Sequence, residues 1–200
     1  MFTWRKPADA EIKRFLQQQA REPFSYDRVG CTAEGKVSPR NGWNVDRCRV
    51  RLGTGRETFE RAQGAIKQWR MFPSEVAQLC YPDCPVEAGA TVAVLYRLWL
   101  VCWILMPAKI VYTLDDEIVA PAGRVRRFGF AYGTLPDHPE RGEERFLIEW
   151  HAADDSVWYD LLAVSQPAHP LARLGYPYTR WEQARFRRWS TVAMQSVVAQ

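Results

Sequence analysis

The sequence predicts an α+β fold in which one antiparallel sheet carries a long C-terminal helix on one face. From residue 75 onward, strand-like segments follow one another at short spacing, and Gly, Pro, Asp or Asn residues separate most of them. Segments with helical periodicity flank this run. Because one face of such a sheet must be buried, the last and longest helix is its natural cover.

The first expected element is a helix over residues 8–21. Ile12 and Phe15 share one face of it, and Asp9 can cap its first turn. The stretch that follows, 22–43, is polar and contains several Gly and Pro residues, so we expect it to be irregular.

A strand and a second helix come next. Residues 44–52 alternate apolar and arginine side chains, as a half-buried strand does. Thr54 and Glu57 then have the spacing of a capping box, which predicts the start of a helix that ends near Arg70.

Six further strands and the C-terminal helix complete the expected elements. The strand candidates are 75–81, 90–98, 108–115, 125–133, 143–152 and 156–165. Asp154, Asp155 and Ser156 form the clearest tight turn between two of them. Residues 168–175 predict a short helix or turn that is broken at Pro177, and 178–198 predict the long helix.

Composition and charge argue against several functional classes. Apolar residues make up 47% of the chain and charged residues 25%, which is ordinary for a globular protein. The net charge of +4 is modest for 200 residues. No nucleic-acid-binding motif is recognisable, and the pI of 8.9 lies just below the value of about 9 that marks such domains. We therefore expect no nucleic-acid partner.

The same reading predicts a cytoplasmic protein. The first residues contain no apolar segment of the kind that a secretory signal needs. A membrane-spanning helix needs about 20 consecutive apolar residues, and the longest uncharged apolar stretch, Leu98–Met106, is far shorter. We therefore expect no integral membrane insertion. The five cysteines are scattered without a metal-ligand spacing, and we expect reduced thiols, no metal and no cofactor.

Five ordered motifs resemble a known family. They are SYDRVGCT at 25–32, RVRLGTGRETFERA at 49–62, KQWRMFP at 67–73, FGFAYGTLPDHPERGEERF at 128–146 and HPLARLGYPY at 169–178. The family is domain of unknown function 1990, grouped with the START-like, birch-pollen-allergen-like helix-grip superfamily. The resemblance implies a curved antiparallel sheet of about seven strands wrapped around a long C-terminal helix. The resemblance covers roughly residues 22–198 and assigns no catalytic residue. We therefore expect a single domain over 22–200, and residues 1–21, which lie outside the resemblance, as an added N-terminal helical extension.

In a helix-grip fold the space between sheet and helix is often a ligand cavity. On the C-terminal helix, Tyr178, Trp181, Arg185, Trp189, Val192 and Ser196 fall on one side, which we expect to face the sheet. Arg185 would lie between two indoles. It either anchors a carboxylate or phosphate group of a ligand or pairs internally, most simply with Glu182.

The strands offer further candidates, but the sequence leaves open which face is concave. Tyr132 lies on one face of 125–133, and Trp158 and Asp160 share one face of 156–165. Inside a cavity, Glu149 or Asp160 would be an acid/base group with a raised pKa. Otherwise they are exposed strand charges or members of a cross-strand ion pair.

Two residues outside the strands complete the candidates. Tyr26, in the irregular segment before the first strand, lies over the cavity mouth or has a structural role only. His138, in the connection between two strands and near several carboxylates, acts as an acid/base group, faces solvent or pins its loop.

Three functions remain open at this point. The first is binding of an apolar or amphipathic small molecule between sheet and helix, with Arg185, Trp181, Trp189, Tyr178, Tyr132, Trp158 and Tyr26 as binding residues. The second is an enzyme on the same scaffold, using Asp160, Glu149 or His138. The third is an interaction or membrane-surface protein without a ligand cavity. A cavity above about 300 Å³ would favour the first two over the third.

Overall fold

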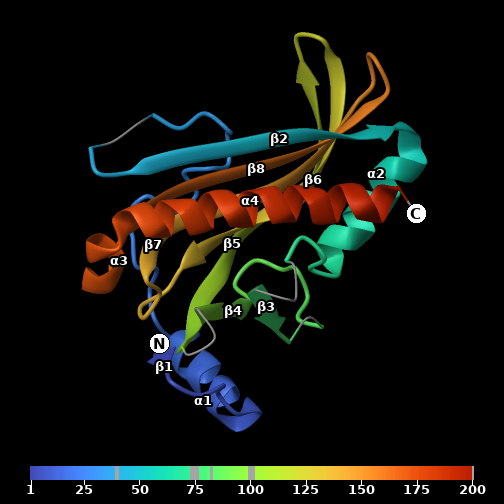
Figure 1. Ribbon diagram of the computed structural model, residues 1–200. Coiled ribbons are helices and arrows are strands. Elements are labelled where there is room, and N and C mark those ends of the chain that lie inside the picture. The colour runs from blue at the N-terminus through green and yellow to red at the C-terminus, as the bar shows by residue number, and fades with distance from the viewer. Residues whose placement is uncertain (39–40, 73–76, 82, 99–101, 200) are drawn as a thin grey trace.

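The computed structural model describes residues 1–38, 41–72, 77–81, 83–98 and 102–199. One antiparallel sheet curves around the C-terminal helix α4 (Tyr176–Val198), which crosses its concave face (Figure 1). The predicted α+β helix-grip fold is confirmed.

The sheet has the strand order β2-β8-β7-β6-β5-β4-β3, and β1 pairs with β5. Its strands are β1 (Phe2–Thr3), β2 (Asn44–Thr54), β3 (Ala77–Cys80), β4 (Thr91–Leu98), β5 (Cys102–Ala120), β6 (Gly123–Thr134), β7 (Glu140–His151) and β8 (Ser156–Pro167). Strand β5 pairs with β4 along its first half and with β6 along its second half, and β1 pairs with Trp103 and Ile104 of the first half. The seven strands β2 to β8 match the expected number, and β1 is an addition that the sequence did not indicate.

Among the described residues, three more helices lie around this frame: α1 (Asp9–Gln19), α2 (Gly55–Lys67) and α3 (Pro170–Leu174). Helix α2 packs on the concave face beside α4. Helix α1 covers the outer, convex face at β4, where Ile12 and Phe15 contact Ala93 and Leu95. Within the described part of the chain, no helix is both long and apolar enough to cross a membrane.

The main core fills the space between the concave face and the two helices α2 and α4. Phe130, Phe146 and Tyr159 are fully buried there, together with Met194 from the second half of α4. Burying a side chain of this size stabilises a fold by roughly 1.5–3 kcal/mol. The C-terminal half of α4 is therefore held firmly against the sheet.

Strand β5 is longer than expected. It begins at Cys102 rather than at residue 108, and Pro107 lies within it, opposite Ala93. Pro107 has no N–H to donate, but its carbonyl oxygen accepts from Leu135 N (3.2 Å). Residues 75–76, which belong to the first of the six strand candidates, lie outside the described residues.

Two connections are also shorter than the sequence indicates. The loop between β6 and β7 spans only 135–139, because Gly142 N donates to Thr134 Oγ1 (2.9 Å) and the strands extend on both sides. Pro177 does not break the chain between helices but stands in the first turn of α4, where a missing N–H costs nothing. The predicted turn at Asp154 and Ser156 is confirmed, since Asp154 Oδ1 accepts from Ser156 N (3.1 Å).

The two predicted helix caps are wrong in detail. Thr54 is the N-cap of α2, but its side chain makes no capping hydrogen bond; Thr58 Oγ1 instead donates to Thr54 O (2.7 Å). Helix α1 has Ala8 rather than Asp9 as its N-cap, and Glu11 Oε2 accepts from Ala8 N (2.8 Å). The hydrogen bond from the N-cap N–H to a glutamate three residues later, which the sequence predicts for α2, is thus found in α1.

Candidate functional site

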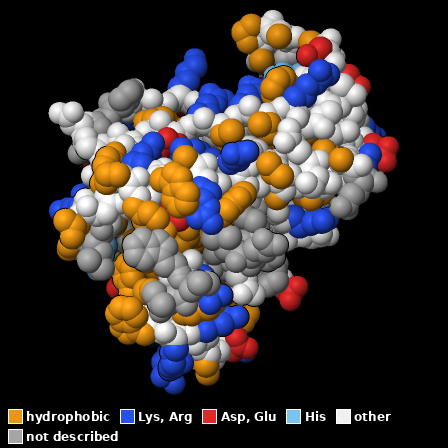
Figure 2. Space-filling model, in the orientation of Figure 1, with side chains coloured by type: hydrophobic (Ala, Val, Ile, Leu, Met, Phe, Trp, Pro, Cys, Tyr) orange, Lys and Arg blue, Asp and Glu red, His pale blue; other side chains and the backbone are white. Residues whose placement is uncertain are grey.

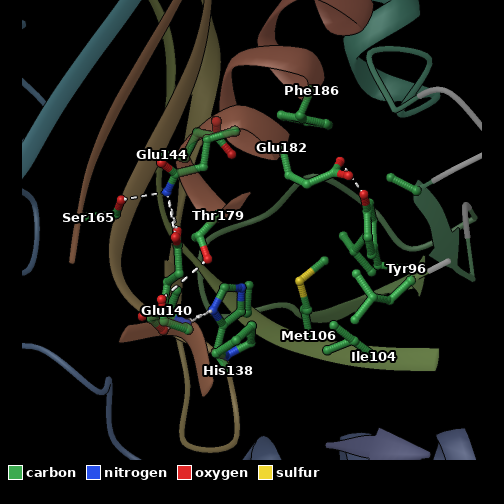
Figure 3. Close-up of a pocket in the computed structure, with 18 of the residues that line it drawn as sticks. Tyr96, Ile104, Met106, His138, Glu140, Glu144, Ser165, Thr179, Glu182 and Phe186 are labelled. Atoms are coloured by element: carbon green, nitrogen blue, oxygen red, sulfur yellow. Dashed lines mark hydrogen bonds between the residues drawn. The ribbon is translucent and has the colours of Figure 1, made fainter. Parts of the chain in front are cut away.

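A cavity of about 660 Å³ lies between the sheet and the N-terminal half of α4. Its apolar lining includes Phe72, Val94, Ile104, Met106, Ala108 and Phe186. Figure 3 shows Tyr96, Ile104 and Met106 on one side of this space, Glu140 and Glu144 on the other, and Glu182 and Phe186 projecting from α4. The volume lies within the usual range of small-molecule pockets, which begins at about 300 Å³.

Strand β7 brings two glutamates to this cavity. Glu140 and Glu144 are an even number of residues apart, so their side chains leave the same face as that of the core residue Phe146. Gly142 lies between them with a φ of +149°, and a Cβ there would stand 1.9 Å from Val164 O. Only glycine fits this position, because a side chain would collide with the backbone of β8, and Gly142 itself borders the cavity between the two glutamates.

The two glutamates are held by uncharged donors. Glu144 Oε2 accepts from Tyr132 OH (2.5 Å), and Gln183 Nε2 donates to both oxygens of Glu140 (2.5 and 2.7 Å). Burial raises the pKa of Glu144 to about 7, against the opposing effects of Tyr132 and Arg187. Burial also raises the pKa of Glu140. A neutral carboxylic acid is therefore accessible at Glu144 near neutral pH.

His138 borders the cavity at the end of the β6–β7 loop. Its Nδ1 accepts from Glu140 N (3.0 Å), which fixes the ring against the first residue of β7. Burial lowers the pKa of His138 to about 4, so the ring is neutral at pH 7. The geometry corresponds to the loop-pinning alternative, although the ring also faces the cavity (Figure 3).

Glu182 joins α4 to the opposite wall of the cavity. Its Oε2 accepts a hydrogen bond from Tyr96 OH on β4, and its Oε1 accepts from Tyr178 OH (2.6 Å). Burial and this contact with Glu182 raise the pKa of Tyr96, so its hydroxyl remains a donor. This link spans the cavity between helix and sheet.

The structure places the aromatic stripe of the C-terminal helix on the outer side of α4. Trp181 is 55% exposed and Val192 is 52% exposed. Arg185 lies between the indoles as expected, with its Cζ 4.9 Å from the ring centre of Trp181 and 4.1 Å from that of Trp189. The α4 side chains that line the cavity or are buried are Tyr178, Thr179, Glu182, Gln183, Phe186, Arg187, Ser190, Thr191 and Met194.

Arg185 has the internal partner that the sequence offered as the alternative to a ligand. Its Nη1 donates to Glu182 Oε1 (3.0 Å), and Arg185 does not line the cavity. Of the expected stripe, Tyr178 alone borders the cavity among the described residues. Figure 2 shows apolar and basic side chains interspersed on the face of the molecule where α4 runs.

Three of the predicted strand candidates lie on the outer face of the sheet. Asp160 is buried there and accepts from Arg47 Nε (3.0 Å). Glu149 pairs with Arg49 (2.8 Å), and the same arginine lies 4.9 Å from the ring centre of Trp158. Both acids thus take part in cross-strand ion pairs and none of the three lines the cavity, whereas Tyr132 does.

Tyr26 also lies on the outer face, in a cluster that we call the outer clamp: Tyr26, Gly30 and Thr32 around Glu143. Tyr26 OH donates to Glu143 Oε2 (2.6 Å), as does Gly30 N (2.7 Å). The Thr32 hydroxyl and backbone N–H both donate to Oε1 (2.5 and 2.9 Å). Gly133 makes room for the tyrosine, because a Cβ there would stand 2.3 Å from its hydroxyl oxygen.

Sequence reasoning missed Glu140, Glu144, Tyr96 and Gln183. The two glutamates could have been found, since they lie an even number of residues from Phe146 and Ile148 and therefore on the same face of β7 as these core residues. Tyr96 and Gln183 carried no such signal, because their roles depend on where α4 crosses the sheet. All five cysteines are free, and the described residues contain no group of three or more His, Cys, Asp or Glu suited to a metal ion.

Comparisons with known proteins give the family. Residues 25–193 match the family described as "Domain of unknown function (DUF1990)". A UPF0548 protein of Dictyostelium discoideum is 37% identical over 199 residues, which cover 93% of this chain and 90% of that protein. A UPF0548 protein of Arabidopsis thaliana is 30% identical over 201 residues, covering 96% of this chain and 95% of that protein, so the similarity extends into residues 1–21.

Among solved structures, Ara h 8.0201 is similar with a TM-score of 0.48 and 9% identity, over 79% of this chain and 99% of that one. A likeness this distant carries no argument about ligand or chemistry. The match over residues 25–193 and the two relatives decide the assignment: the chain belongs to the DUF1990 family.

Proposed function

We propose that the protein binds a small apolar or amphipathic molecule in the cavity between the sheet and α4. The observation that carries this proposal is the cavity itself, about 660 Å³ with mostly apolar walls and a few polar groups among them. Apolar walls provide affinity, and a few placed polar groups orient a ligand. Protein interiors are normally close-packed, so a fold selected for stability alone would have side chains in this space.

Specific contacts also span the cavity. Glu182 links α4 to Tyr96 on β4, and Gln183 links it to Glu140 on β7. These hydrogen bonds join the N-terminal half of α4 to strands on both sides of the cavity. The C-terminal half packs directly on the core through Met194. The helix thus has one half for stability and one half that roofs a binding space.

The test uses N-phenyl-1-naphthylamine, an uncharged dye that fluoresces in apolar surroundings. We expect saturable binding to the wild-type protein and a loss of about tenfold or more in affinity for Ala163→Phe, whose new ring fills cavity volume. Val192→Phe is the matched control, because it adds a similar ring at an exposed position of α4. Equal dye binding by all three folded proteins, or none by the wild type, would contradict the proposal.

A second candidate function is acid/base catalysis on a bound molecule. One observation favours it: the pKa of Glu144, raised by burial to about 7, is close to that of an efficient general acid or base at neutral pH. Mass spectrometry of molecules extracted from cell lysate incubated with the protein separates this candidate from binding alone. Catalysis requires that wild-type protein convert a molecule that Glu144→Gln leaves unchanged.

A further inference from the structure

The carboxyl groups of the cavity outnumber its cations. Among the described residues that line it, the carboxyl side chains of Asp46, Glu140, Glu144 and Glu182 face the same space, and Arg187 is the one Lys or Arg side chain. Glu143 also borders the cavity, but its carboxylate is bound in the outer clamp. The cavity is therefore lined by more acidic than basic side chains.

Two of these four acids have cationic partners in the protein. Asp46 accepts from Arg180 Nη2 (2.7 Å) and lies 3.3 Å from Arg187 Nη2. Burial acts to raise the pKa of Asp46, but the two arginines hold it below its usual value. Glu182 pairs with Arg185 (3.0 Å). Neither acid needs a ligand to balance its charge.

Glu140 and Glu144 differ from them. Their hydrogen-bond donors are the amide of Gln183 and the hydroxyl of Tyr132, which carry no charge. Across the part of the chain that the structure describes, no Lys, Arg or His nitrogen lies within ion-pair distance of either carboxyl group. Glu144 Oε1 has no hydrogen-bond partner within the same residues. An ionised carboxylate buried without a cation is costly, so these two positions lack the partner that they would bind best.

The neighbouring groups cannot supply that partner. His138 is neutral at pH 7 and already accepts a hydrogen bond through Nδ1. Arg187, the lining cation, is engaged by Asp46. Glu140, Gly142 and Glu144 all line the cavity, so a group from outside the protein can reach both carboxyl groups from that space.

We propose that the cavity selects ligands with a basic nitrogen on an apolar body, bound by Glu140 and Glu144. This inference rests on the proposed function and names its ligand class. The ammonium group would complete the ion pairs and take the free oxygen of Glu144, while the apolar body would lie against Ile104, Met106 and Phe186. Fatty acids and other anionic amphiphiles would meet four carboxyl groups and are disfavoured.

The experiment compares three probes with the same apolar chain: decylamine, decanol and decanoate, each titrated by calorimetry at pH 8. We expect decylamine to bind about tenfold or more tightly than decanol, with decanoate the weakest, because a charge-assisted hydrogen bond is about twice as strong as a neutral one. Glu144→Gln should abolish the preference for decylamine over decanol. Glu57→Gln, at an exposed position of α2, is the matched control and should behave as the wild type.

The outcomes separate this inference from the proposed function. Decanol or decanoate binding as tightly as decylamine would overturn the inference and leave the cavity as a binding site. A preference for decylamine that survives in Glu144→Gln would overturn it as well. No binding of any of the three probes would overturn both proposals. Thermal unfolding of each variant confirms that a lost preference does not reflect a lost fold.

Discussion

Glu143 and Glu144 are neighbours in the chain, and the pleat of β7 sends their carboxyl groups to opposite faces of the sheet. On the outer face, Glu143 accepts four hydrogen bonds from Tyr26, Gly30 and Thr32. On the inner face, Glu144 accepts one from Tyr132 and faces a cavity. The difference indicates which acid the protein uses for its own stability and which one it leaves available.

The largest effect is expected at Glu143. Glu143→Gln places an amide where backbone and hydroxyl donors already converge, so we expect the free energy of unfolding to fall by about 3 kcal/mol. Urea denaturation followed by circular dichroism measures this loss. A change below about 1 kcal/mol would mean that the outer clamp contributes little.

Tyr26→Phe tests the same clamp by removing a single hydroxyl. The hydrogen bond to the Glu143 carboxylate (2.6 Å) is buried, and its loss should lower the free energy of unfolding by about 2 kcal/mol. Because Tyr26 lies on the face opposite the cavity, dye binding by the folded variant should equal that of the wild type. Weaker dye binding would show that the two faces are coupled.

Glu144→Gln should raise the free energy of unfolding at pH 8, whereas the two changes in the outer clamp lower it. Folding raises the pKa of Glu144 from about 4.5 to about 7, so the wild type loses stability as the pH rises through this window. The variant should be more stable at pH 8 by roughly 2–3 kcal/mol, and the difference should vanish near pH 4. Thermal unfolding across this range measures it. A variant less stable than the wild type at pH 8 would contradict the comparison between the two glutamates.

Arg185→Ala should have the smallest effect. Its ion pair with Glu182 is partly exposed and its indole contacts lie on the outer side of α4, so we expect a loss below about 1 kcal/mol. Binding of dye and of decylamine should be unchanged, because Arg185 does not line the cavity. Loss of binding would restore the sequence-based prediction that Arg185 anchors the ligand.

The fold could be predicted because its signals are local. Alternation along the strands and helical periodicity at both ends predict the seven strands and the long helix. The rotation of α4 could not be predicted in the same way. Its aromatic residues suggested the buried face, yet Trp181 and Trp189 lie outside around Arg185, while small and polar side chains such as Thr179 and Gln183 face the sheet. The part of α4 that covers the cavity does not need a continuous apolar face. Choosing the most aromatic face of the helix as the buried one therefore gave the wrong face.

The prediction of Asp160 and Glu149 as site residues failed for a related reason. The pairing of β7 with β8 puts Asp160 and Glu149 on the same face of the sheet. The sequence does not show whether this face is the concave one, which holds the cavity, or the outer one. The irregular segment 22–38 covers the outer face, which no periodicity indicates. Two of the motifs that resemble the family meet there, because Tyr26 and Thr32 belong to one and Gly133 and Glu143 to another.

The most direct test of this account is the titration of the Glu144 carboxyl group by carbon-13 NMR, assigned by its absence in Glu144→Gln. In the free protein we expect a pKa of about 7 for this carboxyl group. Saturating decylamine should lower the pKa of Glu144 by at least about one unit, because an adjacent ammonium group favours the ionised form. A Glu144 carboxyl that titrates near 4.5 in the free protein, or one whose pKa does not change with the amine, would contradict it.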